Sequence, residues 1–352
     1  MTSSVPALVS AQNSLAGIEA ALLMTSGESP PIDDVGFPVF DCKAYCSGGS
    51  MNLPAPFNRP DLVIFHSTYI PLHAQIASKL CNDAIPYIIT PRGGMTKGAQ
   101  KVKWFKKRAG NWLFFNNMVR HAAALHCLTQ NEANETKGWG QPIFIVGNGT
   151  AIPSEENLAI LKQSDELRFV FIGRLDPRHK GLDILLEACA LIKPVLLSEH
   201  VQVDLYGSDH HGSMAKLKRQ ISRLELNDVA RLHGPIIGGS KTRLLKESDV
   251  FIHTSRFEGH PMAVLEALAH GVPCLLTPGT NMSSEVAAAG AGWEVKPTPG
   301  EIAEGLNEVI TQKASLEVAG KRARALAIEK YSWQQVARDS VAAYSTYVKP
   351  VG

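Results

Sequence analysis

The sequence predicts an α/β protein made of two doubly wound, Rossmann-like domains. At 352 residues the chain is longer than one ordinary hydrophobic core requires, and its 45% hydrophobic and 19% charged residues are typical of globular proteins. Short apolar runs bounded by turns alternate with helical patterns over most of its length. The runs are continuously apolar rather than alternating in polarity, as expected of parallel strands that helices cover on both faces.

The apolar runs are predicted as strands in both halves of the chain. In the first half they are 62–66, 86–90, 124–129 and 143–148, and in the second half 168–173, 201–207, 230–234, 249–253 and 273–277. Helical patterns between them include 73–82, 181–192, 213–224 and 240–248. Strands that alternate with helices in this way favour two parallel sheets.

A polar, proline-bearing segment at 148–157 predicts the boundary between the domains. We therefore expect a first domain at 1–153 and a second at 154–332. The segment 331–348 has the apolar spacing of an amphipathic helix, and we expect residues 333–352 to cross back to the first domain.

Composition excludes several classes of protein. A net charge of +2 argues against a nucleic-acid-binding surface. The six cysteines lie mostly in apolar runs, which indicates reduced thiols, and no cluster around Cys42 and Cys46 suits zinc. No apolar run reaches ~18 residues and the N-terminus lacks a secretory pattern, so we expect a cytoplasmic protein.

The segment 248–276 is the most informative in the chain. It predicts a strand, a polar turn and a helix that ends at Gly271, with Pro261 near the first helical position. The amides of Met262, Ala263 and Val264 would be free at the helix start, where an anion such as phosphate binds.

Two glutamates, Glu258 and Glu266, flank this helix start. A carboxylate accepts hydrogen bonds from neighbouring hydroxyls, so both suit the diols of a sugar and a ribose beside a diphosphate. The alternative is structural: Glu258 would be a carboxylate at a helix N-terminus, and Glu266 an ordinary helical residue.

A second motif lies at 171–188, where an apolar strand ends in Gly173 and is followed by Arg174 and Lys180. Ligands of open α/β sheets bind beyond the carboxyl ends of the strands, so two cations there suit a diphosphate. In the alternative interpretation, Arg174 pairs with Asp176 or Asp183 on the surface.

Together the two motifs resemble those of the retaining glycosyltransferases of family 4. The matching patterns are G-R-x(5)-K-G at 173–181 and E-G-x-P-x(3)-L-E-A at 258–267. The similarity extends from about Asp61 to the end and includes T-P-R-G-G-M at 90–95, which is similar to enzymes that build exopolysaccharides and O-antigens. The resemblance implies the GT-B architecture, in which two Rossmann-like domains face each other across a cleft.

The resemblance also implies roles for individual residues. Arg174 and Lys180 match the pyrophosphate clamp, Glu266 the ribose ligand, and Glu258 the ligand of the donor sugar. The amides of Gly259 to Val264, which include those of His260, Met262 and Ala263, match the phosphate and sugar cradle. Gly173 ends its strand and lets the backbone approach a ligand. The loop that reads the base matches Gly234, Pro235 and Ile236, with Tyr206 lining the same cleft.

His66 and Arg92 come from the first domain, where each follows a predicted strand. The resemblance implies that both face the donor, and Arg92 could contact the diphosphate or an acidic acceptor. The alternatives are a hydrogen-bonded histidine at a strand end and a surface arginine.

The implied activity is transfer of a hexose from a nucleotide sugar, a uridine diphosphate sugar, to a polysaccharide or lipid-linked oligosaccharide. Since two cations stabilise the leaving diphosphate, we expect no metal ion and no cofactor. Family members open with a strand and a glycine-rich loop, whereas this sequence opens in a helical pattern. Two alternatives stay open: a nucleotide-sugar epimerase of the same fold and, given this opening, a non-catalytic nucleotide-sugar-binding protein.

A basic segment at 97–115 interleaves lysines with Trp104 and Phe105. Such a segment can lie on an anionic membrane, which would suit a lipid-linked acceptor. The alternative is a solvated basic face whose aromatic residues pack into the domain.

Overall fold

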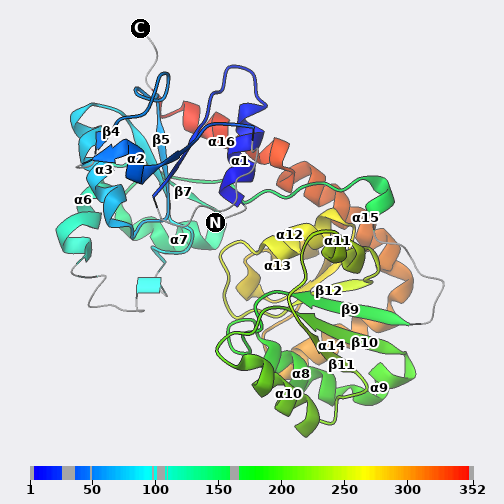
Figure 1. Ribbon diagram of the computed structural model, residues 1–352. Coiled ribbons are helices and arrows are strands. Elements are labelled where there is room, and N and C mark those ends of the chain that lie inside the picture. Colours follow the sequence, from blue (N-terminus) through cyan, green and yellow to red (C-terminus); the bar gives the residue numbers. More distant parts are fainter. Residues whose placement is uncertain are drawn as a thin grey trace. The chain divides into compact units, whose positions relative to one another are not determined.

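The computed structural model describes residues 4–25, 36–47, 50–96, 99–100, 108, 110–158 and 166–348. The chain divides into two compact units (Figure 1). The first unit comprises Met1–Gly149 and Trp333–Gly352, and the second unit comprises Thr150–Ser332.

The second unit contains a six-stranded parallel sheet in the order β11-β10-β9-β12-β13-β14. Its strands are β9 (Leu167–Ile172), β10 (Val201–Tyr206), β11 (Ala230–His233), β12 (Val250–His253), β13 (Cys274–Leu276) and β14 (Gly292–Glu294). This is a doubly wound order, in which the chain runs outward from β9 to β11 and then returns to the other side of β9. The reversal places a topological switch point between β9 and β12.

Helices cover both faces of this sheet (Figure 1). They are α8 (Leu182–Leu191), α9 (Lys193–Ser198), α10 (Ser213–Arg223), α11 (Gly238–Lys246), α12 (Met262–Ala269), α13 (Ser283–Ala288), α14 (Pro299–Thr311) and α15 (Leu316–Leu326). Phe169 and Phe171 of β9 belong to a core that includes α8, α10 and α14. Val170 and Ile172 belong to the opposite core, with α11, α12 and α15. Because both faces are buried, successive residues of the strand must be apolar.

The first unit contains a four-stranded parallel sheet in the order β5-β6-β7-β8. The strands are β5 (Val63–His66), β6 (Tyr87–Thr90), β7 (Ala124–Cys127) and β8 (Ile143–Ile145). Two small sheets pair β1 (Leu22–Met24) with β2 (Val39–Asp41) and β3 (Cys46–Ser47) with β4 (Ser50–Met51). The helices are α1 (Ser4–Asn13), α2 (Cys42–Tyr45), α3 (Pro71–Asn82), α6 (Asn116–Arg120), α7 (Gln130–Thr136) and α16 (Trp333–Ser345).

All of the strands predicted from the apolar runs are present, most of them one to three residues shorter. The sequence did not predict β14, whose three residues Gly-Trp-Glu are too few for a periodic signal. Gly292 allows this strand to approach β13, since a Cβ atom there would lie 1.9 Å from the carbonyl oxygen of Cys274.

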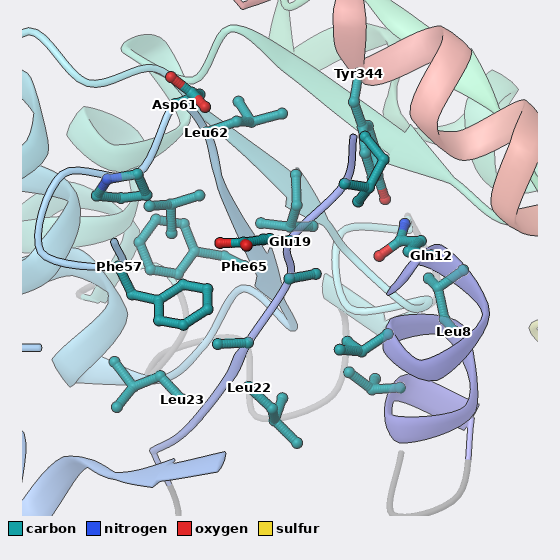
Figure 2. A pocket seen from close by; sticks show the side chains of 18 of the residues that line it. Leu8, Gln12, Glu19, Leu22, Leu23, Phe57, Asp61, Leu62, Phe65 and Tyr344 are labelled. Carbon is teal, nitrogen blue, oxygen red and sulfur yellow. The ribbon is translucent and has the colours of Figure 1, made fainter. Parts of the chain in front are cut away.

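A cavity of about 1390 Å³ lies in the first unit between α1, β1, β5 and α16 (Figure 2). Leu8 of α1, Leu23 of β1, Phe65 of β5 and Tyr344 of α16 contribute to its apolar lining. The strands β1 and β5 belong to different sheets, and residues of both line this cavity.

His126 is buried in the first unit and is held as a neutral ring. Its Nε2 lies 2.8 Å from the carbonyl oxygen of Val146, and its Nδ1 lies 2.9 Å from the Tyr344 hydroxyl. A carbonyl only accepts, so Nε2–H donates to Val146 and Nδ1 accepts from Tyr344. Burial lowers the pKa of His126 to about 4.

We expect this histidine to make the stability of the protein fall with acidification from pH 6.5 to 5. The unfolded chain binds the proton with a pKa of about 6.5, whereas the folded chain does not, so folding weakens as pH falls below that value. Between pH 7 and pH 5, the free energy of unfolding measured in urea should fall by about 2 kcal/mol more in the wild type than in His126→Gln. Both proteins share every other titrating group, so the difference between them isolates the contribution of His126. Equal pH dependence in both proteins would contradict the assignment.

Candidate functional site

Arg174, Lys180 and Glu258 lie in the loops that follow β9 and β12 in the second unit. Since these two strands flank the switch point, the loops that follow them border the crevice where ligands of such sheets bind. The loop after β9 (173–181) and the loop after β12 (254–261) contact each other directly. The Arg256 amide donates to the His179 carbonyl at 3.0 Å, and the His179 ring donates through Nε2 to the Phe257 carbonyl at 2.7 Å.

Glu258 receives three hydrogen-bond donors on one carboxylate oxygen. Its Oε1 accepts from Lys180 Nζ, from Ser255 Oγ at 2.7 Å and from His253 Nε2 at 3.2 Å. The side chains of Lys180 and Glu258 are only 13% and 11% exposed. The pair is therefore largely removed from water, and its Coulombic attraction is weakly screened.

The protonation states of this cluster follow from its contacts. Burial alone would raise the pKa of Glu258, but the hydrogen bond from His253 and the charge of Lys180 hold it well below its usual value. Burial also lowers the pKa of His253, which keeps its ring neutral. With Nε2–H donating to Glu258, the Nδ1 atom of His253 has no hydrogen-bond partner in the part of the chain that the structure describes. Glu258 is therefore an ionised acceptor.

Arg174 lies in the same loop as Lys180, and its side chain is 45% exposed. Its Nη2 is 3.1 Å from His179 Nδ1 and 4.0 Å from Asp176 Oδ2. The alternative pairing with Asp183 does not occur, because Asp183 binds the guanidinium of Arg256 at 2.7 and 3.0 Å. Arg174 is thus held loosely and remains accessible to an anion.

Glu266 is joined to a residue that sequence reasoning missed. Lys241 Nζ donates to both carboxylate oxygens of Glu266 at 2.8 Å. The two side chains are 26% and 25% exposed, so the pair lies at the edge of the site rather than in the core. The only signal in the sequence was that Lys241 falls in the first turn of α11, close behind the loop at 234–236.

The start of α12 differs in one respect from the prediction. Pro261 is the residue before the helix, and the amide of Val264 donates to its carbonyl oxygen at 3.1 Å. The expectation that the Val264 amide would be free was therefore wrong, because the first turn is tightened by this bond. Met262 and Ala263 occupy the first two helical positions, whose amides lie ahead of the intrahelical ladder.

The carboxyl ends of β10 and β11 form the neighbouring part of the crevice edge. Tyr206 stacks on His233, with ring centroids 4.2 Å apart and planes at 9°, and His233 Nε2 lies 2.8 Å from Asp204 Oδ1. Gly234 and Pro235 follow as exposed residues, and Ile236 is half-buried. Tyr206 therefore supplies an aromatic surface here, and residues 234–236 supply backbone groups.

His66 and Arg92 lie together in the first unit. Arg92 Nε donates to His66 Nδ1 at 3.3 Å, and its Nη1 donates to Ser4 Oγ at 3.2 Å and Asn148 Oδ1 at 3.3 Å. Arg92 adopts a left-handed backbone with φ of 50°. Burial and the neighbouring charge of Arg92 lower the pKa of His66 well below its usual value. The interpretation of Arg92 as a simple surface residue is therefore incorrect.

The predicted membrane contact at 97–115 lies mostly outside the described residues, which lack 97–98, 101–107 and 109. Within the part of the chain that is described, no helix combines the length and apolar character needed to cross a bilayer.

The second unit matches a known protein family. Residues 154–326 match the family model of the glycosyl transferases group 1. The chain is 26% identical over 193 residues to the uncharacterized glycosyltransferase MJ1607 of Methanocaldococcus jannaschii, a match that covers 54% of this chain and 47% of that protein. It is 30% identical over 187 residues to spore coat protein SA of Bacillus subtilis, over 50% of this chain and 48% of that protein. The chain thus spans about half the length of the curated relatives it matches.

Solved structures extend the similarity to nearly the whole chain. The crystal structure of Anabaena Alr3699/HepE in complex with UDP and glucose has a TM-score of 0.72 at 18% identity, over 97% of this chain and 95% of that one. Sucrose-phosphate synthase from Thermosynechococcus elongatus has a TM-score of 0.69 at 16% identity, over 96% and 91%. The fold is that of the GT-B glycosyltransferases, and the predicted fold class is confirmed.

Proposed function

We propose that the protein is a retaining, metal-independent glycosyltransferase that moves a hexose from a UDP-sugar to a saccharide or lipid-linked saccharide. The second domain, 154–332, binds the donor, and the first domain, 1–153 with 333–352, binds the acceptor. The observation that carries the proposal is the cluster of Lys180, Glu258 and the exposed Arg174 at a topological switch point. A dry cation beside an ionised carboxylate suits a diphosphate joined to a polyhydroxylated sugar.

Each charged residue then has a separate task. Arg174 and Lys180 stabilise the negative charge that grows on the leaving diphosphate. Glu258 accepts hydrogen bonds from hydroxyls of the transferred sugar, and Glu266 accepts them from the ribose. The backbone of 234–236 reads the base, and UDP is favoured because a structurally similar protein binds UDP and glucose.

In the proposed reaction the acceptor hydroxyl attacks the anomeric carbon from the side on which the diphosphate leaves. The bond from the anomeric carbon to the diphosphate oxygen breaks, and the new glycosidic bond forms on the same face. The departing phosphate oxygen takes the proton of the acceptor, so no carboxylate nucleophile is required. The contribution of the protein is positioning and charge stabilisation.

A thermal-shift screen of nucleotide sugars, followed by transfer assays, tests this function. A UDP-sugar present at ~100 times its Kd should stabilise the fold by about 2.7 kcal/mol. Transfer to an acceptor should give a product with the donor's anomeric configuration, at a rate that EDTA leaves unchanged. Isomerised sugar from donor alone would indicate the epimerase, and binding without turnover on an acceptor panel would indicate the non-catalytic binding protein.

Lys241 is expected to act on donor affinity rather than on the chemical step. The two bonds from Lys241 hold Glu266 in place. Glu266 would bind the ribose equally well in the ground state and in the transition state. Removing Lys241 should therefore raise KM and leave kcat unchanged. We expect Lys241→Met to raise the donor KM ~10-fold with kcat within about twofold. Glu266→Gln should do the same, and the double variant should be no worse than either single one. A lower KM in Lys241→Met would show that the lysine competes with the ribose.

A further inference from the structure

The carboxylate of Glu258 is asymmetric in its contacts. Lys180, Ser255 and His253 all donate to Oε1, which exceeds the two lone pairs that one carboxylate oxygen offers. The other oxygen, Oε2, accepts from no group in the described part of the chain. One oxygen is thus committed to the protein, while the other keeps its full accepting capacity.

The backbone that carries Glu258 is held from a second direction by the turn after β13. Asn281 Nδ2 donates to the carbonyl oxygens of Glu258 at 2.6 Å and Gly259 at 3.0 Å. Thr277 Oγ1 donates to the carbonyl oxygen of Ser255 at 2.6 Å. Each of these bonds joins the turn to the loop that carries Glu258, so the loop is tied at both of its ends.

Close packing reinforces this attachment. A Cβ atom on Gly279 would lie 2.2 Å from the Ser255 carbonyl oxygen, so only glycine allows the turn to approach the loop this closely. Asn281 adopts a left-handed backbone with φ of 60°, a conformation that asparagine tolerates better than most residues. Ser255 itself is fully buried. A loop tethered in this way has little freedom to rotate the carboxylate.

We propose that Ser255 and Asn281 are positioning residues that orient Glu258, with Oε1 fixed by the protein and Oε2 presented to a hydroxyl of the donor sugar. The inference deepens the proposed function and rests on it. Neither residue contacts the sugar in this arrangement. Their role is to place the accepting oxygen within the narrow range of positions that a preorganised site requires.

The test compares variants that remove one positioning side chain at a time. Ser255→Ala removes the hydroxyl donor, and Asn281→Gly removes the amide while keeping the left-handed backbone accessible. Each should lower kcat/KM for the donor ~10-fold, mainly through kcat, since the bonds orient a group that acts on the reacting sugar. Asn281→Asp should lower kcat/KM further, because its carboxylate would face two carbonyl oxygens.

Glu225→Gly is the matched control, because Glu225 also has a left-handed backbone, with φ of 54°, but lies at the end of α10. It should leave kcat/KM unchanged. Wild-type kcat/KM in both Ser255→Ala and Asn281→Gly would overturn the proposal.

A carboxyl ¹³C NMR titration of Glu258 separates this inference from the proposed function. Removing a donor to Oε1 should raise the pKa of Glu258 in Ser255→Ala but not in Glu225→Gly, whether or not the protein transfers sugar. If the wild type transfers no sugar while this pKa rises, the function fails and the positioning of Oε1 stands. An unchanged pKa in Ser255→Ala would overturn the inference even in an active enzyme.

Discussion

Lys180→Met is expected to reduce kcat for sugar transfer ~10³-fold, the largest loss of activity we predict for a single side chain. Methionine keeps much of the length and volume of lysine, so the change removes mainly the charge. In the proposed reaction that charge stabilises the diphosphate as its bond to the sugar breaks. The same charge keeps Glu258 ionised, because Lys180 Nζ donates to its Oε1 in a largely buried pair.

The variant should also lose stability, and the two losses can be separated. Breaking a buried ion pair by removing one partner costs about 3–5 kcal/mol, because the other charge stays buried without compensation. Glu258 has a lowered pKa in the folded protein, so its contribution is present above its unfolded pKa and is lost as pH falls. The double variant Lys180→Met/Glu258→Gln should recover stability but not activity.

Lys296→Met provides the control for Lys180→Met. Lys296 pairs with Glu301 on the surface, where its side chain is 73% exposed, so its loss should change neither stability nor rate measurably. Steady-state kinetics and urea unfolding of the same preparations give both quantities. Transfer by Lys180→Met within tenfold of the wild-type rate would remove this residue from the proposed mechanism.

The sequence could predict those features that depend on local pattern. The continuous apolar run of β9 follows from burial on both faces, so the sheet was predictable from the runs alone. The motifs at 173–181 and 258–267 follow neighbouring strands, so their meeting at the switch point follows from the sheet order.

The remaining features of the site depend on contacts between elements whose spacing carries no periodic signal. The bond from Lys241 to Glu266 joins two helices across 25 positions, and the bond from Asn281 to Glu258 joins two loops across 23. Nothing in the local pattern of SKTRLL or PGTN indicates these partners. The Val264 amide is the opposite case, because its partner, the Pro261 carbonyl oxygen, lies in the same turn of the chain. Tertiary packing, rather than local propensity, decided the partners of Glu266 and of the Glu258 backbone.

Gly181→Ala is expected to lower the free energy of unfolding by about 4 kcal/mol. Gly181 precedes α8 with a left-handed backbone, φ of 65° and ψ of 23°. A Cβ atom there would lie 2.0 Å from the carbonyl oxygen of Thr254, at the start of the loop that carries Glu258. The loops after β9 and β12 would have to separate, so Lys180 would also lose its place beside Glu258.

Gly212→Ala is a closely matched control for this prediction. Gly212 precedes α10 with φ of 73° and ψ of 20°, so it has the same conformation at the same position of a helix, but a Cβ atom there meets nothing within 4 Å. Its replacement should lower the free energy of unfolding by only about 1 kcal/mol, which is the cost of a left-handed backbone for alanine, and should not affect transfer. The difference between the two variants in urea unfolding therefore measures the close approach of the two loops. Equal losses in both would mean that backbone conformation alone requires Gly181, and that the contact with Thr254 is not needed to bring Lys180 to Glu258.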